Sequence, residues 1–479
     1  MSFATKAGII VGAAAFSGMA VAGTGDATND LQSRLEAAEA KIAEMSAQQN
    51  GDWLTEQRSE QIRGIVQDVL ADADTRASLQ GNGATSGYND GFFVQSADGK
   101  WSMKINGLFQ ERFNVGHQPN DVWASGGGPF PPADKDTAFG FETTRAALNF
   151  SGTLAGVAYY DARLDWSPYN GNNGLSSSPL QWAYGGWHCD ENWSVQLGRQ
   201  KMQVTRGFIV NAEDQQAIER SSYDYFWASS QITNGIMAKG SWDQFRMNVM
   251  FSNGFDTNAG TNGNLNTWQN NVQGWAITGR GEWLLEGAWD QFDHIGSAAG
   301  SADAWLLGFG AGYLKGNTAA AAGAVNDDEP DAWLVTADLS YESDGWNLYG
   351  SGSYQRTNTG IAGADDVNSV GFEAGAGMYM DDNNELYGRW QWVNPGLGAG
   401  AVSSNINIAT IGWNHYIAGP NTKLSADWSW CFSDPSMANA MGGGGWGYTG
   451  WWNNTGGAIP GGQTSGSLWL LRTQLQVSF

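Results

Sequence analysis

Arginine recurs on one face of successive segments that alternate polar and apolar residues. Alternate residues of a strand point to the same side, so these arginines share a face with polar residues rather than apolar ones. A guanidinium stays charged and holds five donors in a fixed fork, which suits phosphate and carboxylate groups. The arginines assigned to this face, one per strand, are Arg112, Arg145, Arg163, Arg246, Arg280, Arg389 and Arg472.

Carboxylates on the same face leave two interpretations of these arginines open. Asp161 and Asp165 lie two residues before and after Arg163, and other strands contribute Glu282, Asp338, Glu385 and Asp427. The arginines could attract anions into a lumen, or they could pair with the carboxylates and brace the wall. We predict bracing for most of the arginines, and anion conduction for a subset. Asp161 and Asp165 are predicted to line the lumen together with the arginines.

A long connection from about residue 205 to residue 230 carries opposed charges and several aromatic residues. It contains Asp224 and the five charged residues assigned to a constriction, Arg206, Glu213, Asp214, Glu219 and Arg220. If the connection folds back into a lumen, opposed charges across the narrowest point create a transverse field that sorts solutes. The alternative is a surface loop packed by its own aromatic residues. We predict a constriction loop.

Apolar and polar residues alternate with a period of two from Trp101 to the end of the chain, and this alternation positions the residues described above. After residue 22 there is no stretch of about twenty apolar residues, so a chain that spans a membrane must do so with strands. The last segment, residues 466–479, alternates apolar and polar residues and ends on Phe479, which is typical of an outer-membrane barrel. The predicted fold is therefore all-β, a 16-stranded antiparallel transmembrane β-barrel.

The connections between these strands provide a second test of the strand assignment. Short turns rich in Gly, Asp and Asn alternate with long Gly/Asn-rich loops, as expected for periplasmic and external connections. Residues 284–303 break this rule, because they form a long connection where a tight turn is expected. The predicted strands are 101–113, 140–154, 158–167, 179–188, 193–204, 231–240, 244–252, 272–283, 304–314, 331–342, 346–355, 368–380, 385–393, 405–417, 422–432 and 466–479.

The amino-terminal part has a different organisation. Residues 1–22 have the lysine, apolar run and small-residue cleavage site of a signal peptide, which predicts export to the outer membrane. Residues 23–88 are predicted to form a helical, coiled-coil extension, and the barrel is predicted to occupy residues 89–479. Heptad spacing predicts a trimeric stalk, with a single amphipathic helix as the alternative. The residues of the predicted seam are Leu31, Leu35, Ala38, Ile42 and Met45.

Composition excludes several classes of function. The formal charge of -24 makes nucleic acid an improbable partner, and the 67 Gly and 25 Trp fit a barrel wall with aromatic residues at the membrane interface. The four histidines are scattered, and no phosphate-binding loop or nucleophile elbow occurs. We therefore predict no enzymatic activity, no metal and no cofactor. Cys189 and Cys431 are predicted to remain unpaired.

Several segments together resemble the phosphate-selective porin O and P family, particularly its planctomycete-type relatives. Those segments are residues 91–99, 105–107, 140–145, 148–152, 195–201, 219–221 and 251–255. The resemblance implies a trimeric porin with a coiled-coil extension and an inward third loop. Arg145 and Lys201 match basic positions of the family, whereas Arg199 and Gln200 depart from its pattern. Because the chain is acidic, phosphate selectivity is not transferred with the fold.

Two functions follow as expectations. The first is a water-filled channel for passive diffusion of small polar solutes or ions, formed by a homotrimer in contact with membrane lipid. The second is a structural outer-membrane barrel that tethers envelope layers and conducts little.

Overall fold

The computed structural model describes residues 35–41, 84–117, 137–166, 179–227, 232–255, 274–316, 329–358, 365–396, 405–432 and 468–479. The chain divides into two compact units, residues 1–82 and residues 83–479. In the first unit, residues 35–41 are helical, and Leu35 and Ala38 are exposed. Leu31, Ile42 and Met45 of the predicted stalk lie outside the described residues, so the trimeric stalk stays a prediction.

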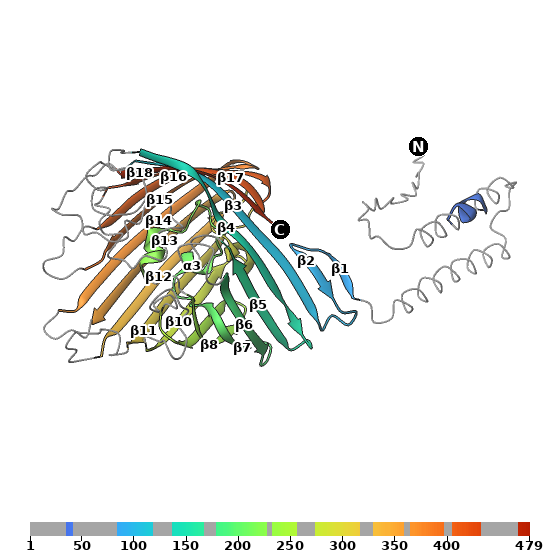
Figure 1. Cartoon of the computed structure of the whole chain (residues 1–479), viewed down its shortest axis with the longest axis horizontal. Helices are drawn as coiled ribbons and strands as arrows, with labels where there is room; N and C mark the ends of the chain where they lie inside the picture. The colour runs from blue at the N-terminus through green and yellow to red at the C-terminus, as the bar shows by residue number, and fades with distance from the viewer. Residues whose placement is uncertain are drawn as a thin grey trace, which may run out of the picture. The chain divides into compact units, whose positions relative to one another are not determined.

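The second unit is a closed antiparallel barrel (Figure 1). Its sheet has 18 strands, of which β1 and β2 form a separate hairpin, leaving sixteen (18 minus 2) in the ring. The ring closes where β18 pairs with β3, from Trp469 opposite His117 to Ser478 opposite Leu108. The ring strands are β3 (Ser102–His117), β4 (Thr137–Leu154), β5 (Ala158–Asp165), β6 (Leu180–His188), β7 (Trp193–Lys201), β8 (Ile232–Ser241), β9 (Phe245–Ser252), β10 (Trp275–Glu286), β11 (Ala304–Lys315), β12 (Asp331–Ser343), β13 (Trp346–Asn358), β14 (Val367–Asp381), β15 (Asn384–Asn394), β16 (Ile406–Ala418), β17 (Thr422–Cys431) and β18 (Leu468–Ser478).

The ring confirms the predicted strands, each within a few residues of its predicted ends. Outward positions hold apolar side chains with large exposed fractions, such as Ile411 at 61%, Leu197 at 60% and Trp333 at 53%. Such a surface is stable against lipid and unfavourable against water, so the exterior suits a membrane. Among the described helices, none is both long and apolar enough to cross a membrane.

A hairpin that the sequence did not predict extends the sheet beside the carboxyl terminus. β1 (Thr85–Tyr88) pairs with β2 (Phe92–Gln95), and β2 pairs with β3 from Ser102 to Ile105, beyond the last residues that β18 pairs. Phe479 exchanges backbone hydrogen bonds with Gly107, and its ring lies 5.7 Å from that of Phe92. The end of the predicted helical extension, residues 85–88, is therefore a strand.

The connection after β10 is long because it has structure of its own. It contains the 3-10 helix η3 (Trp289–Asp293), and we call residues 287–303 the inner turn. Phe292 is 1% exposed and packs with Leu284, Ala304 and Leu306. The other described connections at this end of the barrel are tight, and we call it the tight-turn end. Of the two cysteines, Cys189 is exposed and Cys431 is buried.

The inner face of the wall is not polar throughout, contrary to the alternation expected from the sequence. Toward the end opposite the tight turns it carries a cluster of buried apolar side chains, which we call the apolar layer. The wall residues of this layer are Met237, Met250, Ala276, Ala332, Leu334, Val393, Ile406, Ile408, Cys431 and Leu470. They are buried because a loop inside the barrel packs against them.

Candidate functional site

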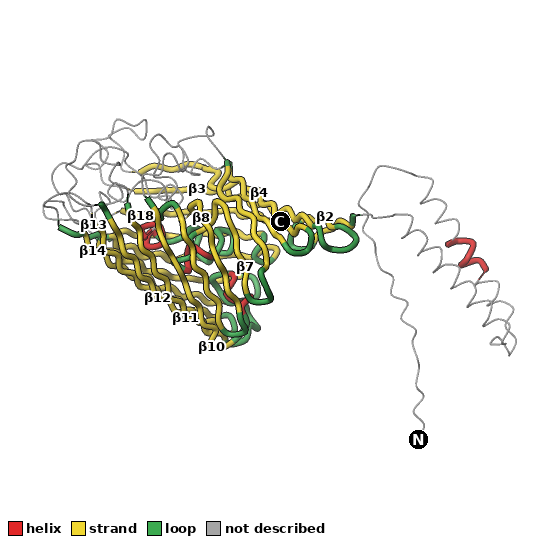
Figure 2. The backbone as a smooth tube through the Cα atoms, turned by 90° about the horizontal axis from the view of Figure 1, so that it is seen from below, coloured by secondary structure: helices red, strands yellow, loops and turns green. Residues whose placement is uncertain are grey.

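The loop inside the barrel is the connection between β7 and β8, residues 202–227, which we call the inserted loop. It contains two short helices, α3 (Arg206–Ile209) and α4 (Ser222–Trp227), which lie within the ring of strands (Figure 2). Met202, Val204 and Tyr223 are 0% exposed and belong to the apolar layer. Burial of apolar side chains from both loop and wall stabilises this inward position.

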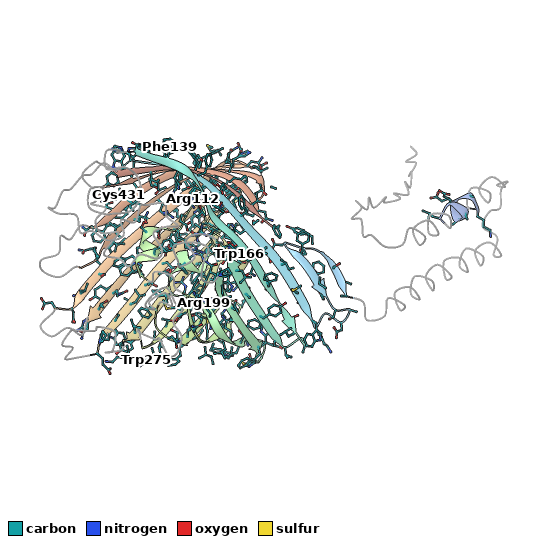
Figure 3. All side chains as sticks on the ribbon, in the orientation of Figure 1. Arg112, Phe139, Trp166, Arg199, Trp275 and Cys431 are labelled. Carbon is teal, nitrogen blue, oxygen red and sulfur yellow. The ribbon has the colours of Figure 1, made fainter. Side chains whose placement is uncertain are left out.

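Glu219 anchors the inserted loop to one side of the wall. Its two carboxylate oxygens each accept a hydrogen bond of 2.7 Å from Arg145, and Arg112 lies 3.4 Å away. Burial alone would disfavour the charged carboxylate, but Arg145 and Arg112 overcome this and lower the pKa of Glu219 to about 2. Figure 3 labels Arg112 among the side chains of the barrel. The carboxylate is therefore ionised at any physiological pH.

The wall from β13 to β17 also holds the inserted loop, through the backbone and amide groups of the loop. Gln216 Nε2 donates to Glu385 Oε1 at 2.6 Å, and Lys423 Nζ donates to the Gln215 carbonyl at 2.7 Å. Arg389 donates to the Glu219 carbonyl at 2.9 Å. The Tyr223 hydroxyl lies 2.8 Å from Ser351 Oγ, further along the wall. The inserted loop thus crosses the lumen and is bonded on both sides.

Each of the seven arginines predicted to face inward has a carboxylate partner. The geometry is that of cross-bracing, because the guanidinium charges are balanced where they lie. The pairs are Arg112 with Glu142 and Glu219, Arg145 with Glu219, Arg163 with Glu213, Arg246 with Glu282, Arg280 with Glu282 and Asp338, Arg389 with Glu373, and Arg472 with Asp427.

The two predicted pore-lining aspartates lie in different surroundings. Asp161 accepts hydrogen bonds from Trp182 Nε1 and from Asn149 Nδ2, and it lines a cavity. Asp165 is 1% exposed. Of the two, Asp161 is the one placed where a solute in that cavity would meet it.

The five charged residues predicted for the constriction also separate into two groups. Glu213 and Asp214 line cavities, whereas Arg206, Glu219 and Arg220 are buried within the loop and its contacts. Arg220 donates to the Gly207 and Val210 carbonyls, at 3.2 and 2.7 Å, so it stabilises the fold of the loop.

Two cavities lie beside the inserted loop, the smaller along β5 to β8 and the larger toward the tight-turn end, where it also borders β10, β14, β16 and β17. The larger has a volume of about 890 Å³ and reaches the tight turns at Ser241, Asn383 and Pro420. The smaller has a volume of about 370 Å³ and is bordered by Trp182 and Lys201. Their linings share a set of residues that we call the passage residues. These are Asp90, Gln203, Ile209, Asn211, Glu213, Asp214 and Lys239.

The charges of the passage come from both the loop and the wall. Burial, reinforced by the neighbouring Glu213 carboxylate, raises the pKa of Asp214 to about 6. Burial also opposes ionisation of Glu213, but Arg163 at 2.9 Å holds its pKa at about 2. Lys239 faces them from β8. Opposed charges across a passage form a transverse field.

Lys239 and Lys423 line a cavity but were not predicted as site residues, although strand alternation in the sequence indicates that they point inward. Both lie on predicted strands at positions that alternate with outward apolar residues. For the inner turn, the sequence contained a weaker indication, which was the unusual length of the connection. For the hairpin residue Asp90, the sequence contained no indication of a place in the site.

Residues 124–299 match the family described as phosphate-selective porin O and P. The sequence matches no curated protein. In structure the chain is similar to the anion-selective porin from Comamonas acidovorans, with a TM-score of 0.53, 13% identity, and coverage of 79% of this chain and 100% of that one. It is also similar to Salmonella typhi OmpF in complex with daunomycin, with a TM-score of 0.50, 13% identity, and coverage of 82% and 100%.

Proposed function

We propose that the chain is an outer-membrane porin whose passive diffusion path runs beside the inserted loop, and the match of residues 124–299 to the phosphate-selective porin O and P family supports this. The path passes the passage residues, follows the wall along β5 to β9 and opens toward the tight-turn end, where the larger cavity also borders β14, β16 and β17. Its cargo is small hydrophilic solutes and ions. No catalytic step is part of this function.

The observation that carries this proposal is the shared lining of the two cavities. Seven residues border both, and they include Asp90, Glu213, Asp214 and Lys239, which suit hydrated solutes. Elsewhere across the lumen the inserted loop is bonded or packed to the wall. A solute that crosses the described part of the barrel therefore meets the passage residues.

We propose weak ion selectivity for this path. The seven inward arginines are balanced by carboxylates, so they do not form a row of uncompensated positive charge. The other charges at the cavities have both signs, with Lys201, Lys239 and Lys423 against Asp161, Asp214, Asp293 and Asp382. Phosphate selectivity does not follow from this balance. The reversal potential under a salt gradient should accordingly be small.

We further propose that the protein is a homotrimer in contact with lipid. The apolar exterior of the ring supports the lipid contact. The heptad positions Leu35 and Ala38, both exposed on a helix, support a stalk that joins copies.

Single-channel recording of the purified full-length protein in a planar bilayer tests the channel. Stepwise openings with a small reversal potential are expected, and openings in groups of three would support the trimer. A membrane that stays silent over repeated insertions, with the protein shown to be inserted and folded, would overturn the proposal.

The alternative is a structural barrel with little conductance, and one observation favours it. The apolar layer and the inserted loop fill part of the lumen with side chains such as Tyr223 and Leu334 that are 0% exposed. A filled lumen of this kind excludes water and ions. The same recording separates the two functions, because the structural barrel predicts silence.

A further inference from the structure

The inner turn enters the barrel from the tight-turn end and meets the inserted loop. Tight turns suffice to join neighbouring strands, so a long connection that folds inward has another role. Its base is fixed, because Phe292 packs with Leu284, Ala304 and Leu306. We propose that the inner turn is the second half of the constriction and that Arg206 is the positioning residue that joins it to the inserted loop.

Arg206 connects the two segments directly. Its Nη2 donates to the Phe292 carbonyl at 2.8 Å and to the His294 carbonyl at 3.3 Å. The centre of the guanidinium lies 5.3 Å from the centroid of the Phe292 ring. Because Arg206 is 1% exposed, these contacts are shielded from water, which strengthens both the charge-assisted bonds and the cation–π interaction.

A second contact places the inner turn beside the passage. The backbone N–H of Ile295 donates to the Asp214 carbonyl at 3.0 Å. The next residue, Gly296, has φ of 133°, a conformation that favours glycine. Ile295 and Gly296 also border the larger cavity, as Asp214 does. The inner turn therefore holds the backbone of a passage residue and forms part of the wall below it.

The far end of the inner turn is tied to the next tight turn. Gly345 N–H donates to the Ala298 carbonyl at 3.1 Å, and Gly300 N–H donates to Asp344 Oδ1 at 2.5 Å. The inner turn is thus fixed at Phe292, at Ala298 and Gly300, and at its contact with Arg206, and we call this fixed segment the strut. It limits the movement of the inserted loop toward the tight-turn end, and so it sets the width of the passage.

This inference rests on the proposed path past the passage residues. It predicts that the path widens when the contact between Arg206 and Phe292 is weakened, whether the substitution is made at Arg206 or at Phe292. R206K retains the charge but loses the planar fork and the stacking on Phe292. F292A removes the ring from the opposite partner.

The main experiment is single-channel recording of the full-length R206K and F292A variants and of the double variant. Each single variant should raise conductance by about twofold or more, with noisier open states. The conductance of the double variant should be little higher than that of either single variant, because both substitutions remove the same contact. The matched controls are R356K, at the exposed rim pair with Asp366, and F309A, on the outward face, and both should conduct as the parent protein does.

Thiol accessibility provides a readout that does not need conduction. In a C189S/C431S background, I209C places a thiol among the passage residues. Adding R206K should increase its rate of modification by a small charged thiol reagent by about tenfold, because the loop gains freedom to open.

The two measurements separate this inference from the proposed function. A parent protein that conducts, with R206K and F292A indistinguishable from it in conductance and in thiol accessibility, overturns the strut and leaves the channel intact. A silent parent protein overturns the channel, and the rate of I209C modification then decides the strut alone. Additive conductance changes in the double variant would also contradict a shared contact.

Discussion

The two sides of the lumen are built from the same alternating strands, yet they have opposite surroundings. On the side of β12 to β17, the inward residues Glu385, Asn414 and Gln391 are at most 2% exposed and are bonded to the inserted loop. On the side of β5 to β9, Asp161 and Lys239 are partly exposed at cavities. We call these the dry side and the wet side; only at the tight-turn end does the larger cavity also border the dry side, at Tyr379, Tyr416 and Lys423.

The difference shows that strand alternation decides only which way a side chain points. Whether that side chain meets protein or solvent depends on where the inserted loop lies. Burial of a charged group is unfavourable unless a partner compensates it, so the loop can dock only where its groups find partners. Those partners come from both sides, Arg145 and Arg163 on β4 and β5 as well as Glu385 on β15, and the space left over becomes the path.

The largest effect should come from removing the carboxylate that anchors the loop. E219Q leaves Arg145 and Arg112 buried with one anionic partner fewer, and removing one member of a buried pair costs about 3–5 kcal/mol. We expect a lower unfolding temperature and faster proteolysis within residues 202–227. The control is D366N at the exposed rim pair, where the expected cost is about 0–1 kcal/mol. Equal stability of E219Q and the parent protein would show that Glu219 does not anchor the loop.

A smaller loss should follow from a cavity in the apolar layer. Leu334 is 0% exposed, and L334A should cost about 2–5 kcal/mol of stability. The reversal potential should stay unchanged, since Leu334 lies on the dry side. L339A, at an outward position that is 42% exposed, is the matched control and should cost less. An altered ion preference in L334A would mean that ions pass the apolar layer.

On the wet side, a charge reversal should change selectivity rather than stability. K239E replaces a positive charge at the passage with a negative one, so cation preference should rise roughly threefold in permeability ratio. The reversal potential under a salt gradient measures this shift. R356E makes the same change at the exposed rim and should have little effect. If both variants behave alike, the passage does not control selectivity.

The smallest effect should be the titration of Asp214. Its pKa is raised to about 6, so the carboxylate is charged above that pH and neutral below it. Lowering the pH from about 7 to about 5 therefore neutralises most of this negative charge, and anion preference should rise with a midpoint near the raised pKa. D214N should abolish this titration. E213Q should keep it, because the pKa of Glu213, about 2, lies outside this window.

Much of the fold could be predicted because its signal is local. A period of two marks each strand, and the predicted ring strands were all confirmed. The hairpin of β1 and β2 was missed because each strand has only four residues, too few for alternation to be recognised. The inner turn was noticed only as a connection of unusual length, since its contacts with Arg206 join residues far apart in the chain.

The site was predicted less completely for the same reason. The sequence identified the inward arginines and the charged inserted loop, but it left open which charges compensate one another. Only the structure assigns Glu219 to Arg145 and Glu213 to Arg163. It also separates the constriction residues that face a cavity, Glu213 and Asp214, from those that are buried. The roles of these residues in conduction stay predictions.

The sequence by itself therefore determined the strands, their alternation and the side to which each wall residue points, because a strand has a fixed two-residue period. Tertiary structure alone decided which inward residues are neutralised, which are dry and where a path remains. The physical reason is that docking of the inserted loop depends on contacts between distant residues. Glu219 and Arg145 are separated by 74 positions, and Gln216 and Glu385 by 169. No local pattern encodes such pairings.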